Sequence, residues 1–187
     1  MRRSGLALVL VLALAPVTGC GYNTIQTYEE QVDASKGQIE VTLKRRADLV
    51  PNLVETVKGF AKQESEVLTN VTRARAGLVG ALERPGGTDP AELAQADAQL
   101  TRSINLVVEA YPDLKSNENF LRLQDELVGT ENRIATARTD YNQSVQQYNA
   151  YIRRFPQNLT AKVTGAKSRT YFEVADAAER EAPAVKF

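Results

Sequence analysis

The chain has 187 residues, of which 43% are hydrophobic and 25% are charged, and these proportions are ordinary for one folded domain. Its 23 basic and 23 acidic residues give a formal net charge of zero, so no basic field points to nucleic acid as a partner. Histidine is absent and there is a single cysteine. A zinc site, a histidine general base and an intramolecular disulfide are therefore excluded, and no metal or cofactor is expected.

The chain begins with two arginines and an unbroken apolar run from Leu6 to Ala15. This run is too short for an ordinary transmembrane helix but has the length and flanks of a secretory signal peptide. The sequence Val17-Thr18-Gly19-Cys20 resembles the lipobox of bacterial lipoproteins. By that resemblance residues 1–19 are removed and Cys20 carries a diacylglycerol and usually a further acyl chain such as palmitate. Two or three chains anchor a protein stably in a membrane.

A plain signal peptidase site with an incidental cysteine is the alternative interpretation of Cys20. The position of the sole cysteine favours the lipoprotein, facing outside the cytoplasm of a bacterial cell envelope. Gly21 follows where an aspartate would favour retention, so in a Gram-negative cell we expect the outer membrane.

One long helix is predicted from about Tyr22 to Glu83, about 60 residues and about 90 Å long. Its apolar residues follow two interleaved sevenfold series, as in the seam of a bundle or coiled coil. They are Ile25, Val32, Ile39, Leu43, Val50, Leu53, Val57, Phe60, Val67, Val71, Ala74 and Leu78.

Charged residues also fall on inward positions of this helix, namely Glu29, Lys36, Arg46 and Glu64. The apolar stripe is thin before Leu43, so residues 20–42 are expected to form a mobile or loosely packed membrane-proximal stalk. An unpaired charge in a core is costly, so Arg46 and Glu64 are expected to meet polar partners such as Glu131 and Arg138. These charges are interpreted as setting the register between helices and not as catalytic groups.

Pro51 is expected to kink or briefly break this helix, because proline lacks the backbone donor and crowds the preceding turn. Asp48, Pro51 and Asn52 therefore form a candidate partner-binding notch. A simple bend that wraps the helix around its neighbours is the favoured interpretation of Pro51.

Breakers are concentrated from Arg84 to Pro90, so we expect the tip of a helical bundle there, with Asp89 as the N-cap of the next helix. Arg84, Pro85 and Asp89 are candidate partner-binding residues at this tip. The next helix is predicted from Ala91 to about Tyr111, where Pro112 ends it. Its apolar face carries Leu93, Ala96, Leu100, Ile104, Val107 and Tyr111.

The stretch Asn117–Pro156 predicts a long central helix with one narrow inward stripe, which needs partner helices to bury it. The stripe is Phe120, Gln124, Leu127, Glu131, Ile134, Arg138, Tyr141, Val145, Tyr148, Ile152 and Phe155. Residues 157–187 are expected to fold back over the overhanging end of this helix as the fourth element, part helix and part extended, with a break at Gly165.

Several blocks of this sequence resemble the LemA family. They are Leu43–Val54, Val57–Ala61 with Glu64, Asn117–Pro156 and Tyr171–Phe187. The resemblance implies a long antiparallel up-and-down four-helix bundle over residues 43–187, tethered to a bacterial membrane at its N-terminus, and no established enzymatic activity. Family members typically carry an uncleaved N-terminal membrane helix. This chain has a short apolar run that ends in its sole cysteine, so a lipid anchor is expected instead.

Together these features predict a non-enzymatic, membrane-tethered scaffold or adaptor that binds an envelope or membrane protein, or a second copy of itself. A small-ligand or lipid-binding module is the alternative, with a cavity between helices near Tyr141, Tyr148 and Tyr151. An enzyme would have to use carboxylate pairs, either Glu131 with Glu64 or Asp125 with Glu126, and without histidine this is disfavoured.

Overall fold

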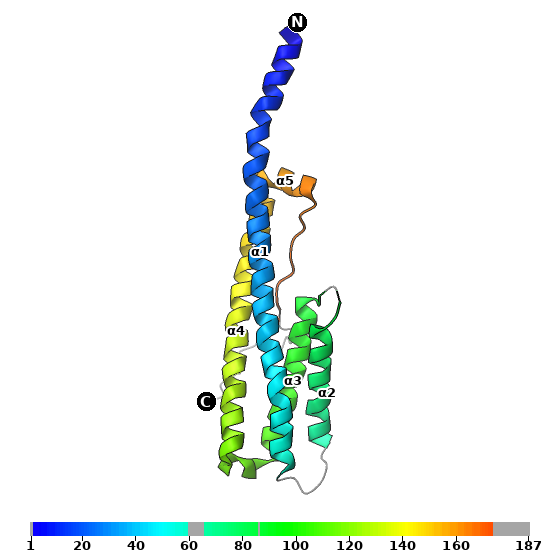
Figure 1. Ribbon diagram of the computed structural model, residues 1–187, viewed down its shortest axis with the longest axis vertical. Helices are drawn as coiled ribbons and strands as arrows, with labels where there is room; N and C mark the ends of the chain where they lie inside the picture. The colour runs from blue at the N-terminus through cyan, green and yellow to red at the C-terminus, as the bar shows by residue number, and fades with distance from the viewer. Residues whose placement is uncertain (1, 60–65, 86, 174–187) are drawn as a thin grey trace, which may run out of the picture. The chain divides into compact units, whose positions relative to one another are not determined.

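The structure is a computed structural model that describes the backbone of residues 2–59, 66–85 and 87–173, and the side chains within these ranges from residue 21 onward. Predictions for the Cys20 side chain, Phe60, Glu64 and residues 174–187 lie outside this part. The described elements are all helical: α1 (Arg2–Lys58), α2 (Glu66–Leu82), α3 (Pro90–Ala110), the 3-10 helix η1 (Pro112–Ser116), α4 (Glu118–Arg153) and α5 (Gln157–Thr164) (Figure 1). No described helix is long and apolar enough to cross a membrane.

The chain divides into two compact units. Unit 1 takes residues 1–36 and 140–170, and unit 2 takes residues 37–139 and 171–187. Unit 2 contains the second part of α1, the first part of α4, and the whole of α2 and α3, which makes it the four-helix part of the protein. Unit 1 contains the remaining parts of α1 and α4 together with α5.

The first long helix is shorter than predicted, because α1 ends at Lys58 and a separate helix, α2, begins at Glu66. The end of α1 was not predicted because no cluster of helix-breaking residues marks it. A single glycine, Gly59, which is a poor helix former, follows the last residue of α1. The sevenfold pattern also shifts after this point, since Leu68 is buried and Val67 is only half-buried. The fourth helix of the bundle is therefore α2 and not the C-terminal segment.

Helix α1 runs through Pro51 without the predicted break, and Pro51 itself is exposed. The tip and the third helix agree with prediction. Asp89 caps α3 by accepting a hydrogen bond from the Ala91 amide at 3.0 Å, and Pro90 is the first residue of the helix.

The stripe of α4 is buried at most of the predicted positions: Phe120, Leu127, Ile134, Tyr141, Val145, Tyr148 and Ile152. At the three polar positions the buried residue is the preceding one, Leu123, Thr130 and Ala137. Gln124, Glu131 and Arg138 thus lie beside the core, where their polar groups reach solvent or a partner. Phe155 was predicted to be inward and is 79% exposed, because α4 ends at Arg153.

In unit 1 the helices α1 and α4 run antiparallel in a fixed register. The Tyr28 and Tyr151 rings lie 5.2 Å apart, and the Ser35 and Ser144 hydroxyls are hydrogen-bonded at 3.0 Å. Ile25 in the same unit is fully buried. The thin stripe therefore gives a packed helix pair here, and the expectation of loose packing before Leu43 is wrong.

The C-terminal segment folds back as one short helix and one extended stretch, as predicted for its described part. Helix α5 ends at Thr164, and its C-cap is Gly165, whose φ of 75° lies in the left-handed region. Residues 166–173 then continue without helix.

We expect Gly165→Ala to lower the free energy of unfolding by about 1 kcal/mol, because a side chain is strained at this φ. Gly37→Ala is the matched control. It lies inside α1, and a methyl group there would meet no atom within 4 Å, so it should raise the stability by up to about 1 kcal/mol. Urea unfolding of the purified protein followed by circular dichroism measures both, and equal effects would contradict the assigned cap.

Candidate interaction sites

A buried ion cluster joins three helices of unit 2, and we call it the Asp97 cluster. Asp97 on α3 binds Arg46 of α1 through Oδ1 at 3.0 Å and Arg138 of α4 through Oδ2 at 2.7 Å. Glu131 of α4 lies 3.5 Å from the second terminal nitrogen of Arg46. The predicted pairing of Arg46 with Glu131 is therefore present, but the main partner is Asp97, which the sequence analysis did not identify.

The residues of this cluster differ in how far their side chains are exposed to solvent. The side chains of Arg46 and Asp97 are 2% and 4% exposed, whereas that of Glu131 is 53% exposed. Because both oxygens of Asp97 are held by guanidinium groups, this carboxylate positions the two arginine side chains. A pocket of about 220 Å³ opens beside it, between α3 and α4.

A signal for Asp97 was present in the sequence. It follows Leu93 by four residues and precedes Leu100 by three, so it occupies a core position of α3, where the prediction chose Ala96. The cluster also reaches the C-terminal segment, since the Arg138 guanidinium lies 4.8 Å from the ring centre of buried Phe172.

In unit 1 the extended stretch is held by side chains of α4. The side-chain amide of Asn149 makes two hydrogen bonds to the backbone of Arg169. Its nitrogen donates to the Arg169 carbonyl, and its oxygen accepts from the Arg169 N–H, each at 2.9 Å. The Tyr141 hydroxyl donates to the Thr170 carbonyl at 2.9 Å. Side chains of α4 therefore hold this stretch through hydrogen bonds to its backbone.

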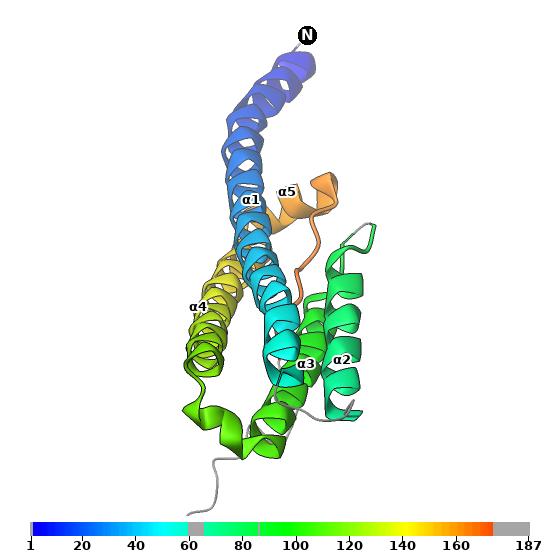
Figure 2. The ribbon, with the colours of Figure 1, turned by 60° about the horizontal axis from the view of Figure 1, so that its bottom comes forward.

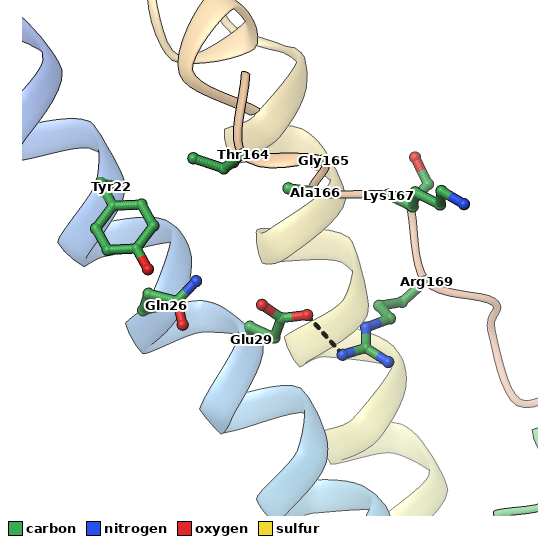
Figure 3. Close-up of a pocket in the computed structure, with 9 residues that line it drawn as sticks. Tyr22, Gln26, Glu29, Thr164, Gly165, Ala166, Lys167 and Arg169 are labelled. Atoms are coloured by element: carbon green, nitrogen blue, oxygen red, sulfur yellow. Dashed lines mark hydrogen bonds and ion pairs between the residues drawn. The ribbon is translucent and has the colours of Figure 1, made fainter. Parts of the chain in front are cut away.

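A pocket of about 450 Å³ lies between this stretch and α1, and its wall is Tyr22, Gln26, Glu29 and residues 164–169. Figure 3 shows the ion pair that crosses it, between Arg169 and Glu29 at 2.7 Å. Asp33 lies 3.5 Å from the same guanidinium nitrogen. The pocket is polar and open, so it suits a small charged or hydroxylated molecule better than an apolar one.

The tyrosines proposed for a ligand cavity do not form one together. Tyr141 and Tyr148 are buried in the packing of unit 1, and the Tyr151 ring contacts the Tyr28 ring in a tilted arrangement. Burial raises the pKa of the Tyr148 phenol, and the negative charge of Glu29 adds to the shift.

The predicted notch and tip are both on the surface of unit 2. Asp48, Pro51 and Asn52 are exposed on α1, and Arg84, Pro85 and Asp89 are exposed between α2 and α3. Lys44 lies 3.7 Å from Glu83, which places the tip one to two helical turns of α1 away from the notch. The two are therefore neighbouring but separate surfaces.

Two described residues of the tip, Arg84 and Thr88, make hydrogen bonds to the neighbouring helices. Two hydrogen bonds join the Arg84 guanidinium to Glu92, at 2.5 and 2.7 Å, and they raise the pKa of Arg84. The buried Thr88 hydroxyl donates to the Ala81 carbonyl.

Of the carboxylates considered for catalysis, Glu131 contacts Arg46, and Asp125 and Glu126 are exposed neighbours on α4. In the described part of the chain no group of three or more histidine, cysteine or acidic residues could hold a metal ion.

We expect Asp97→Asn to lower the free energy of unfolding by about 3 kcal/mol or more, because it leaves the charge of Arg46 buried with a weakened partner. Glu131→Gln should cost less than about 1 kcal/mol, because this carboxylate is half in solvent. Denaturant unfolding of both variants checks the assignment, which equal losses would contradict.

We expect Asn149→Ala to release residues 166–173, since two backbone hydrogen bonds are lost. At about 1 kcal/mol each, their loss should speed tryptic cleavage after Lys167 or Arg169 more than about tenfold. Gln146→Ala, an exposed change on the same helix, is the control and should leave the cleavage rate unchanged. Equal rates in both variants would show that Asn149 does not hold the stretch.

Comparison with known proteins gives a consistent result. The model of the LemA family matches residues 35–187. The chain is 30% identical over 175 residues to magnetosome proteins MamQ 2 and MamQ 1 of Paramagnetospirillum magneticum, covering 81% of this chain and 64% of each relative. It is 24% identical over 140 residues to the LemA protein of Metamycoplasma hominis, covering 75% of this chain and 63% of that protein.

The chain thus spans less than two thirds of the length of these relatives. The family match, however, extends from the middle of α1 to the end of the sequence. It includes every residue of the Asp97 cluster and the extended stretch. On this match, which covers most of its length, the chain belongs to the LemA family.

Proposed function

We propose that this LemA family protein is a non-enzymatic cell-envelope lipoprotein that serves as a helical scaffold or adaptor for an envelope or membrane protein. The observation that supports this proposal most directly is that the buried charges of the Asp97 cluster pair with one another. Both oxygens of Asp97 are paired with the guanidinium groups of Arg46 and Arg138, so this buried carboxylate holds α1, α3 and α4 in register.

A lipid on Cys20 would be the tether. Gly21, the next residue, is buried, and a Cβ built on it would lie 3.4 Å from Thr160 of α5. An acyl chain at Cys20 would therefore attach directly to a folded part of unit 1, with no flexible spacer. Such an attachment suits a scaffold, because it limits the positions that unit 1 can adopt above the membrane.

The partner surfaces in this proposal are the tip and the notch of unit 2. Their candidate residues are exposed, and at the tip the Arg84 guanidinium is already paired with Glu92 of α3. A preformed surface loses less conformational entropy on binding than a mobile one. The partner would be an envelope or membrane protein, or a second copy of this chain.

The test is crosslinking in living cells of the native host, with a photoreactive amino acid at Asn52 or Pro85 of the full-length protein. We expect a reproducible partner, identified by mass spectrometry, from these two sites and not from Gln143, an exposed residue of α4 in unit 1. Capture should be lost with Cys20→Ala, which removes the tether. If no protein is captured, or if the same proteins are captured from all three sites, the tip and the notch are not the partner-binding surfaces.

A second candidate function is the binding of a small polar ligand, which the open pocket at Glu29 and Arg169 favours. Native mass spectrometry of detergent-free protein would detect a bound molecule. Its loss in Glu29→Gln, with retention in Glu131→Gln, would assign it to this pocket.

A further inference from the structure

Large apolar side chains are exposed together at α5 and just before it. Phe155, Leu159 and Val163 are 79%, 54% and 88% exposed, and they recur every four residues. Within α5, Leu159 and Val163 lie on the face opposite Ala161, which is buried. The short helix therefore packs on the protein by one face and presents an apolar face to the outside.

The same segment is strongly basic, although the whole chain has no net charge. Residues 153–169 contain five basic residues and no acidic one: Arg153, Arg154, Lys162, Lys167 and Arg169. Arg169 is held by Glu29 and Asp33, and the other four are exposed. Exposed apolar residues flanked by cations are typical of a segment that lies in the interface of an anionic membrane.

The position of α5 agrees with this chemistry. Thr160 lies against Gly21, the residue that directly follows Cys20. Figures 1 and 2 both show α5 crossing the N-terminal part of α1 and not running along it. A membrane that holds Cys20 would therefore lie close to α5, which would meet the lipid headgroups with its length along the surface.

We infer that α5, together with Phe155 just before it, is a membrane-docking element: Phe155, Leu159 and Val163 enter the surface of the bilayer that holds the N-terminus, and the flanking cations contact anionic headgroups. This inference rests on the proposed anchoring at Cys20. It adds a second point of attachment, so that unit 1 is fixed to the membrane both by an acyl chain and by a helix face.

The test uses the full-length protein purified from its host, with Val163→Cys labelled by the environment-sensitive dye NBD, since Cys20 is the only natural cysteine and its thiol is blocked when lipidated. The protein is reconstituted into vesicles of phosphatidylcholine mixed with phosphatidylglycerol. We expect a blue-shifted NBD emission and quenching by dithionite at least about fivefold slower than for the same label at Gln95→Cys, an exposed position on α3.

Flotation of the vesicles separates this inference from the anchor. If the protein floats with the vesicles but the dye is quenched equally fast at positions 163 and 95, the anchor is present and docking by α5 is contradicted. A Cys20→Ala variant that still floats with position 163 protected shows that docking stands without the lipid. Protein that does not float, or protection of position 163 in the absence of vesicles, as in a contact with a second copy, also overturns the inference.

A matched pair of substitutions tests the apolar face directly. Leu159→Asp, at an exposed residue of α5, should return position 163 to the fast quenching of the control. Leu121→Asp, at a 43% exposed leucine of α4, should leave the protection unchanged. Protection that survives Leu159→Asp would exclude this face as the docking surface. Vesicles of phosphatidylcholine alone should give at least about threefold less protection, because the basic residues lose their anionic partners.

Discussion

Unit 2 depends on one carboxylate that is shared between two guanidinium groups. Asp97 receives Arg46 from α1 and Arg138 from α4, so a single side chain on α3 determines where both neighbouring helices sit along their axes. Apolar stripes with a four-three spacing tolerate a slip of one heptad, whereas a buried charge does not, because any slip leaves it without a partner. The cluster thus supplies the specificity that the repeating apolar seams lack. Glu131, half in solvent, balances the second positive charge at little cost in desolvation.

The elements of this fold that sequence predicted are those whose signals are local. The tip around Asp89, the third helix and most of the α4 stripe follow from capping residues and periodicity, and each was identified correctly. The end of α1 was missed because Gly59 stands alone and no cluster of breakers surrounds it. Asp97 was missed for another reason: its spacing from Leu93 and Leu100 indicated a core position, but Ala96 was assigned there instead. The guanidinium groups that neutralise Asp97 come from residues 51 and 41 positions away in the sequence.

The candidate sites were less predictable than the fold. The notch and the tip were correctly expected at the surface, but exposure is a weak criterion for binding, and their role stays a proposal. The pocket at Glu29 and Arg169 depends on a contact across 140 residues, which no local pattern could indicate. The exposed residues at α5 were present in the sequence as Phe155, Leu159 and Val163, yet Phe155 was assigned to the inward stripe of α4, and Leu159 and Val163 to the segment that covers it. Only the end of α4 at Arg153 shows that the stripe is interrupted there and that its continuation faces outward.

The extended stretch solves a physical problem of unit 1. Two helices alone cannot enclose a stripe as bulky as Tyr141, Val145 and Tyr148, so a third element must cover them. An extended chain in that place has backbone amide and carbonyl groups with no strand beside it, and such groups are costly to leave unpaired. The amide side chain of Asn149 has both a donor and an acceptor, so it pairs with both backbone groups of one residue, as a neighbouring strand would. Covering the stripe in this way leaves α5 free of that task, which is why its own apolar face can remain outside the core.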